Sequence, residues 1–251
     1  MSRNFELLHE AGRVQELLRQ RVVEQAGPAP VLLVPGTPSV HIDGVAREEV
    51  SKLVQRLFFA PSPQRPRQVV FCGTEPGNGS SWMAARAADL LAAQVPGAVC
   101  VVDCDLQSPS LHREFKVQNQ FGLADALVGM ESIRQYVQQL SRPNLWLLSS
   151  GMVTDKSRQL LTMEPMRRRL LELRAEFDYV LLDVTALSVA NDCSVLGNWC
   201  DGITLVLKAN SSSRKGARQA LKDLQEANAP VLGAVLNQRT FPIPEGIYKR
   251  L

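Results

Sequence analysis

A glycine-rich turn follows a short apolar run and precedes a helical pattern, and its residues are suited to phosphate binding. The turn reads Gly73-Thr74-Glu75-Pro76-Gly77-Asn78-Gly79-Ser80-Ser81. Backbone N–H groups converge on an anion in a turn of this kind, because they point outward from the helix N-terminus. Any strand-to-helix turn also favours Gly, Asn and Ser, so the turn alone leaves a purely structural interpretation open.

The residue after the last glycine decides what chemistry this turn could support. In a working phosphate loop that residue is a lysine, which reaches the β- and γ-phosphates of a nucleotide. Here it is Ser80, and the next residue, Ser81, keeps the hydroxyl that normally touches Mg²⁺. We therefore expect Gly77, Asn78, Gly79, Ser80 and Ser81 to contact a nucleotide without the usual cation.

Three aspartates follow apolar runs further along the chain. Asp103 and Asp105 end one run, one residue apart, and Asp183 ends another. Carboxylates at strand ends near a phosphate loop hold Mg²⁺ or orient its waters. Capping of a helix or turn is the alternative for each acid alone. Together they favour a site with Ser81, Asp103 and Asp183 as metal ligands and with Asp103 and Asp105 as catalytic acids.

The elements that must position these residues alternate in type from Val69 onward. Continuous apolar runs separated by helical stretches indicate a mostly parallel sheet covered on both faces. Right-handed crossovers then give a doubly wound α/β fold, in which ligands sit at the carboxyl ends of the strands. The expected strands are Val69–Cys72, Val99–Val102, Leu145–Leu148, Tyr179–Leu182, Ile203–Leu207 and Val231–Leu236, and the expected helices are Ser81–Gln94, Ser157–Glu176 and Ser213–Ala227.

The 251 residues are divided into an N-terminal extension, residues 1–60, and a compact α/β domain, residues 61–251. The extension contains helical stretches at Asn4–Gln25 and Ala46–Phe59, joined by a linker. A cluster of prolines after the second stretch marks the start of the domain. The first helix is interpreted either as a docking element for a partner or as a cover for a sheet edge.

Composition and charge narrow the class of protein. The net charge of +3 is too small to indicate nucleic acid as a partner. No signal peptide and no apolar run of about 18–20 residues is found, so we expect a cytoplasmic protein that reaches the inner membrane through a partner. The five cysteines match no zinc signature and are expected to be free thiols.

The ordered set of motifs resembles the cytoplasmic kinase domain of bacterial tyrosine kinases, the capsule and exopolysaccharide co-polymerase ATPases in the deviant-Walker group of P-loop NTPases. The resemblance covers Glu48–Asn237. Asp103–His112 looks like the family's second Walker motif, D-x-D-L-R-x-P-S-L-H, and Phe121–Gly129 is similar to its G-L-x-D-x-L-x-G. The resemblance implies that the chain binds ATP or ADP with Mg²⁺ and that Asn237 contacts the base. It also implies a membrane co-polymerase or chain-length determinant protein as partner, and a homo-oligomer.

The chain departs from the family pattern at several places that bear on phosphoryl transfer. The family's self-association motif, E-x-x-R-x-x-R, keeps one basic residue in Glu49–Gln55, and only one of three tyrosines, Tyr248, lies near the C-terminus, where the family has a tyrosine cluster. The other departures are Ser80 for lysine, Gln107 for arginine, and Asp183-Val184-Thr185-Ala186 for D-T-P-P.

These departures favour a pseudokinase-like regulatory or scaffold protein of exopolysaccharide or capsule biosynthesis and export, with weakened nucleotide binding. The retained acids support an alternative: an ATP-dependent protein-tyrosine kinase or ATPase that works with a substituted loop. In that case Arg86 or Lys208 would supply the missing charge. A partition-type ATPase is a further alternative, but such a protein requires lysines at the positions of Glu75 and Ser80, and this chain has neither lysine.

Overall fold

The computed structural model describes residues 44–61 and 65–238. The expected helix Asn4–Gln25, the linker before residue 44 and Tyr248 lie outside the described residues. The strands are β1 (Gln68–Gly73), β2 (Val99–Asp103), β3 (Gln138–Gln139), β4 (Leu145–Leu148), β5 (Tyr179–Val184), β6 (Gly202–Lys208) and β7 (Val231–Asn237). The helices are α2 (Gly44–Val54), η1 (Gln55–Phe59), α3 (Ser80–Ala92), α4 (Leu111–Glu114), α5 (Leu123–Val128), η2 (Ile133–Gln135), α6 (Asp155–Leu160), α7 (Glu164–Glu176), α8 (Asp192–Trp199) and α9 (Arg214–Glu226).

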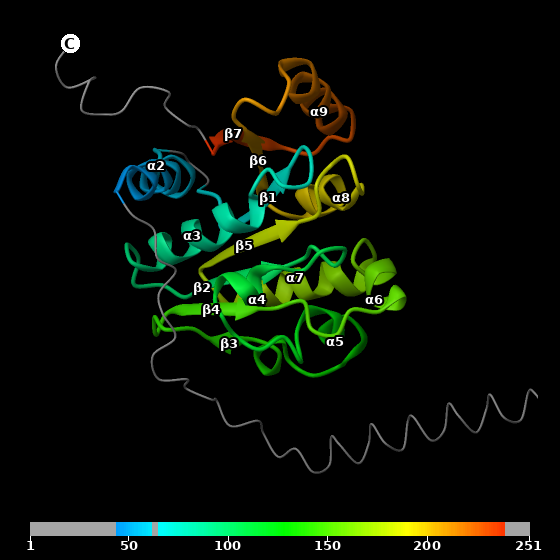
Figure 1. Ribbon diagram of the computed structural model, residues 1–251. Helices are drawn as coiled ribbons and strands as arrows, with labels where there is room; N and C mark the ends of the chain where they lie inside the picture. The colour runs from blue at the N-terminus through cyan, green and yellow to red at the C-terminus, as the bar shows by residue number, and fades with distance from the viewer. Residues whose placement is uncertain (1–43, 62–64, 239–251) are drawn as a thin grey trace, which may run out of the picture. The chain divides into compact units, whose positions relative to one another are not determined.

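The seven strands form one sheet in the order β3-β4-β2-β5-β1-β6-β7 (Figure 1). All neighbouring strands are parallel except β3 and β4, which are antiparallel. The expected doubly wound, mostly parallel α/β fold is therefore confirmed. This order places β1 between β5 and β6, so the turn after β1 opens at the middle of the sheet, with the acidic ends of β5 and β2 on one side.

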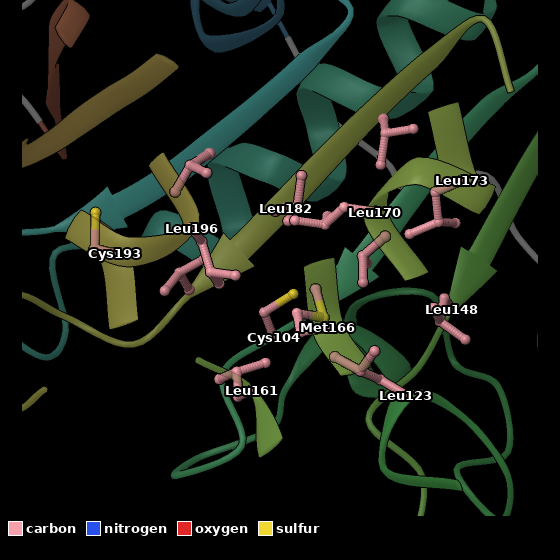
Figure 2. Packing of buried hydrophobic residues seen from close by; sticks show 14 of the residues in the cluster. Cys104, Leu123, Leu148, Leu161, Met166, Leu170, Leu173, Leu182, Cys193 and Leu196 are labelled. Carbon is pink, nitrogen blue, oxygen red and sulfur yellow. The ribbon is translucent and has the colours of Figure 1, made fainter. Parts of the chain in front are cut away.

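Alternating side chains of the central strands enter two separate cores, one on each face of the sheet. Val69 and Phe71 pack with α2, η1 and α3, whereas Val70 and Cys72 pack with α7, α8 and α9. Every residue of β1 and β2 is buried. Figure 2 shows the second core, in which Leu170 of α7 lies beside Leu182 of β5, while Cys193 and Leu196 of α8 lie together at the other side of the view. Burial on both faces explains why these strands read as continuous apolar runs.

The expected single helix Ser157–Glu176 is wrong, because the structure has two helices there. Helix α6 begins at a Thr154 cap, whose hydroxyl accepts a hydrogen bond from the Ser157 N–H at 3.1 Å. Pro165 lies in the first turn of α7, where its missing N–H costs nothing, and it prevents the helix from continuing through residues 161–163. The proline was visible in the sequence and marks the break.

Arg169 is buried, although it belongs to a run of three consecutive arginines, residues 167–169, and such a run usually forms a solvated helix face. Its side chain is 2 % exposed. The guanidinium donates hydrogen bonds to the carbonyl oxygens of Ala126, Gly129 and Glu131, and it pairs with the Glu172 carboxylate at 2.6 Å. These acceptors satisfy the charge, and they fix the end of α5 to α7.

Helix α2 packs against the first core through Val50 and Val54, and it contacts α3. Its outer face carries Lys52, which pairs with Glu48 at 3.0 Å and with Glu49 at 2.9 Å. The domain boundary at residues 60–61 stays a prediction. None of the helices in residues 44–61 and 65–238 combines the length and apolar character needed to cross a lipid bilayer.

Candidate functional site

The turn between β1 and α3 keeps the backbone form of a phosphate loop. Gly77 and Gly79 have φ angles of 80° and 84°, a left-handed conformation that side chains disfavour. A Cβ atom on Gly79 would lie 2.3 Å from the Asn237 Nδ2 atom. Gly79 is also the N-cap of α3 and offers no side-chain cap. The first N–H groups of α3 have no intrahelical acceptor and can therefore face an anion.

Two asparagines hold this loop in place. Asn78 is 3 % exposed, and its Nδ2 donates to the Thr74 Oγ1 at 2.9 Å and to the Val206 carbonyl at 3.0 Å. Asn237 Nδ2 donates to the Asn78 carbonyl at 3.0 Å. The Asn78 side chain therefore points into the protein, so it would reach a nucleotide only through its backbone. The amide nitrogen of Asn237 is engaged with the loop, and its contact with a base stays a prediction.

The structure brings Asp103 and Asp183 together at the ends of neighbouring strands. They are register partners across β2 and β5, and both are completely buried. Asp103 Oδ2 accepts hydrogen bonds from the Ser110 and Leu111 N–H groups, each at 3.0 Å. Asp103 Oδ1 and both oxygens of Asp183 have no hydrogen-bond partner among the described residues. Unpartnered buried carboxylate oxygens are costly, which indicates a missing proton, water or cation.

The surroundings of these two acids favour their neutral forms. Burial raises the pKa of Asp103 to about 7, the Asp105 charge adds to the rise, and the Leu111 and Ser110 N–H groups oppose it. Burial also raises the pKa of Asp183 well above its ordinary range, and the Asp103 charge acts in the same direction. Two carboxylates this close do not both ionise readily unless a cation joins them.

Ser80 and Ser81 open α3 beside Asp183. Their hydroxyls lie near enough to oppose the rise in the Asp183 pKa, but neither makes a hydrogen bond to it in the described structure. The expected metal ligands Ser81, Asp103 and Asp183 therefore share one region. Their roles stay predictions.

Asp105 is held more firmly than the sequence indicated. Its Oδ1 accepts hydrogen bonds from the Thr185 Oγ1 at 2.7 Å, the Ser108 N–H at 3.0 Å and the Gln107 N–H at 3.1 Å. Thr185 stands where the resembling family has proline, so this departure adds a hydrogen bond. Register could have revealed the contact, because Asp105 and Thr185 each lie two residues beyond the partners Asp103 and Asp183.

Arg86, one of the two cations expected to replace the loop lysine, is engaged elsewhere. Its guanidinium pairs with the Glu114 carboxylate and lies 4.6 Å from the centre of the Trp82 ring. Trp82 in turn packs against the first core. Arg86 therefore links α3 to α4 and does not pair with Asp103 or Asp183.

The residues present fit a nucleotide with Mg²⁺ better than a metal ion alone. Within the described ranges, no three His, Cys, Asp or Glu side chains are grouped so that they could hold a metal. Mg²⁺ often takes only one or two protein ligands and completes its shell with phosphates and waters. The unpartnered oxygens of Asp103 and Asp183 beside the loop suit that arrangement.

The sequence is similar to those of proteins named tyrosine-protein kinases. The chain is 29 % identical over 190 residues to the tyrosine-protein kinase YwqD of Bacillus subtilis, covering 76 % of this chain and 80 % of that protein. It is 25 % identical over 192 residues to the tyrosine-protein kinase Etk of Escherichia coli, covering 76 % of this chain but 26 % of Etk. No family model matches the chain.

Solved structures with a similar fold include a kinase domain of the same class of protein. The kinase domain of the Escherichia coli tyrosine kinase Etk superposes with a TM-score of 0.71 at 23 % identity, and the match covers 79 % of each chain. The chain thus spans most of YwqD but about a quarter of Etk. It is a homologue of the bacterial tyrosine-protein kinases and has the P-loop α/β fold of their kinase domains.

Proposed function

We propose that this protein is a nucleotide-binding regulatory relative of the tyrosine autokinases that serve exopolysaccharide and capsule assembly, and that it transfers phosphate poorly or not at all. The observation that carries the proposal is a phosphate loop with an intact backbone and no lysine. Gly77 and Gly79 keep their left-handed conformations, while Ser80 stands at the cationic position. Such a loop can bind phosphates through N–H groups but lacks part of the transition-state stabilisation.

The acidic side of the site supports the same proposal. Asp103 and Asp183 can contact Mg²⁺ or its waters, and bound Mg²⁺ would neutralise phosphate charge. Asp105 is fixed by the Thr185 hydroxyl, so it stays oriented when no ligand is present. Catalysis by phosphoryl transfer, however, depends mostly on cations placed around the phosphates. A loop without its lysine can hold a nucleotide through N–H groups and Mg²⁺, but it stabilises the transition state less well.

The described tyrosines support a regulatory function too. The Tyr136 hydroxyl donates to the Glu131 carboxylate at 2.5 Å, and the ring faces the Arg169 guanidinium. Tyr179 packs edge-on against Phe58, with 5.6 Å between the ring centres. Because both side chains are engaged in these contacts, neither is a free acceptor for phosphorylation by a second copy of the chain. Autophosphorylation would therefore depend on Tyr248.

We further propose that the protein docks on a membrane co-polymerase or chain-length determinant protein through the nucleotide-site face and α2. The outer face of α2 is polar, since Arg47, Glu48 and Glu49 are exposed while Val50 is buried. A polar face of this kind suits a partner that binds reversibly. A homo-oligomer through α2 is the corresponding arrangement for self-association.

A nucleotide titration with and without Mg²⁺, followed by assays of phosphate release and tyrosine phosphorylation, tests the proposed function. We expect saturable binding of ADP and ATP and no turnover above that of the Asp103→Asn variant. Circular dichroism of both proteins controls for folding. Turnover by the natural chain that Asp103→Asn abolishes would contradict the regulatory function and establish the alternative, a kinase or ATPase that works with a substituted loop.

A further inference from the structure

We propose that Lys208 supplies the positive charge that Ser80 does not provide, and that its ammonium binds the phosphates of a nucleoside di- or triphosphate. This inference rests on the proposed nucleotide binding and deepens it. It assigns the phosphate-binding cation to the end of β6 instead of the loop. Four observations carry it: the face of the sheet on which Lys208 lies, its neighbours, its lack of a counter-charge, and the engagement of other cations.

Strand β6 places the Lys208 side chain on the same face as the phosphate-loop helix. Val206 belongs to the core formed with α3, while Ile203 and Leu205 belong to the opposite core. Since successive side chains of a strand alternate between faces, Lys208 lies on the Val206 side. Val206 pairs in register with Gly73, the first residue of the loop, so Lys208 lies two residues beyond that level, beside the loop.

The neighbours of Lys208 touch the loop directly. Lys208 is the register partner of Asn237, and adjacent strands lie about 4.8 Å apart. Asn237 lies on the same face, since Val235 packs against the α3 core. The Asn237 amide donates to the Asn78 carbonyl and lies against Gly79. Asn237 reaches the loop from β7 with a short side chain. The longer side chain of Lys208, on the neighbouring strand β6, is therefore long enough to reach the loop as well.

The backbone at Lys208 is anchored while its ammonium is available. The Lys208 N–H donates to the Ser212 Oγ at 3.0 Å, and the same oxygen accepts a hydrogen bond from Asn78 Nδ2 at 3.3 Å. The residue is half-buried. No described acid pairs with its ammonium, and no described acceptor takes a hydrogen bond from it. A half-buried lysine with a fixed origin and no counter-charge among the described residues is prepared for an anionic ligand.

Three other cations near the two sides of the site already have partners. Arg86 is paired with Glu114. On the acidic side, Arg158 donates to the Leu106 carbonyl at 3.0 Å and to the Asp155 carboxylate at 3.3 Å. Arg113 donates to the Pro109 carbonyl at 3.1 Å. Lys208 is therefore the described cation best placed to reach phosphates above Gly79.

The test compares Mg²⁺ complexes of ATP, ADP and AMP by calorimetric titration of the full chain. Lys208→Met keeps the length of the side chain and removes its charge. We expect it to lower the affinity for ADP and ATP by about ten- to a hundredfold, the value of a charge-assisted contact, and to change AMP binding much less. Lys215→Met, an exposed lysine in the first turn of α9, is the matched control and should bind as the natural chain does.

Introducing Ser80→Lys into the Lys208→Met variant should restore most of the lost ADP affinity, which a merely structural role for Lys208 would not permit. If Lys208→Met does not fold, Lys208→Gln replaces it, and Lys208→Arg should retain affinity within a few-fold. Unchanged ADP binding by Lys208→Met, or an equal loss for AMP, would overturn the inference while leaving the proposed function standing. Absence of nucleotide binding by the natural chain would overturn both.

Discussion

At the amino ends of the strands Asp201 has a partner for each carboxylate oxygen, whereas at the carboxyl ends Asp183 has none among the described residues. Asp201 Oδ2 accepts from the Arg67 and Gln68 N–H groups at 2.7 and 2.8 Å, and its Oδ1 pairs with the Arg174 guanidinium at 3.0 Å. These donors hold the pKa of Asp201 below its ordinary value, against the effect of burial. The same sheet therefore stabilises one carboxylate and leaves another uncompensated.

The difference separates structure from function. A protein that satisfies its buried charges at one end of a sheet could do so at the other, and costly unpaired groups concentrate where ligands bind. Asp103 and Asp183 lie at the end where the parallel strands direct their carboxyl termini toward the phosphate loop. The unpaired acids are therefore evidence for a ligand that is positively charged or carries a metal ion.

The largest expected effect concerns Asp103, at the carboxyl ends of the strands. The pKa of Asp103 is raised from 3.8 to about 7, so the ligand-free protein loses stability as the pH rises across that interval. At about 1.4 kcal/mol for each pH unit, the loss approaches about 4 kcal/mol. Asp103→Asn keeps an oxygen for the Ser110 and Leu111 N–H groups and removes the titration. We expect the variant to be more stable than the natural chain at pH 8.

Urea unfolding of both proteins at pH 5 and pH 8, without metal or nucleotide, measures this effect. The gain from Asp103→Asn should shrink at pH 5, where Asp103 is mostly protonated in the native chain. A variant that is less stable than the natural chain at both pH values would contradict the prediction.

An intermediate effect of opposite sign is expected at the amino end. Asp201→Asn removes charge-assisted hydrogen bonds to Arg174 and to two N–H groups, so it should lower the free energy of unfolding by about 1.5–3 kcal/mol at pH 7. Because the pKa of Asp201 is lowered, its stabilisation is present above the unfolded pKa and is lost as the pH falls through the folded pKa. The two proteins should therefore converge in stability in acid, and equal stability at pH 7 would refute the prediction.

The smallest expected effect concerns the hydrogen bond from Thr185 to Asp105, which lies within the candidate site. Thr185→Val removes the hydroxyl that donates to Asp105 but preserves the shape of the buried side chain. Since two backbone N–H groups still bind the Asp105 oxygen, stability should fall by only about 0.5–1.5 kcal/mol. Thr185→Ser is the control that keeps the hydroxyl. It loses only the methyl group, so it measures the contribution of that group separately. Thermal unfolding compares the three chains, and a valine variant as stable as the natural chain would contradict the prediction.

The strands and the phosphate loop could be predicted from sequence because their signals are local. Buried parallel strands read as continuous apolar runs. The predicted strand Leu145–Leu148 matches β4, and the predicted strand Tyr179–Leu182 lies within β5. The glycines at 77 and 79 identified the loop, since their conformations favour residues without a side chain. Strand β3 was not expected, because two consecutive glutamines carry no strand pattern.

The contacts that shape the candidate site could not be predicted in the same way, because they join residues far apart in the chain. Asp105 and Thr185 are separated by 80 positions, and Arg169 meets carbonyl oxygens 38 to 43 positions away. A carbonyl acceptor leaves no mark on a sequence, so a buried arginine and an exposed one look alike there. Only the strand order reveals which acids become neighbours.

The hydrogen bond between Asn237 and Asn78 spans 159 positions and has a consequence for biosynthesis. The chain leaves the ribosome from its N-terminus, so the loop emerges long before β7 does. Asn78 also needs the Val206 carbonyl, 128 positions later. The loop can therefore take its final form only once β6 and β7 have been made and have docked. A nascent chain truncated before β6 should carry the complete loop sequence yet be unable to hold a nucleotide.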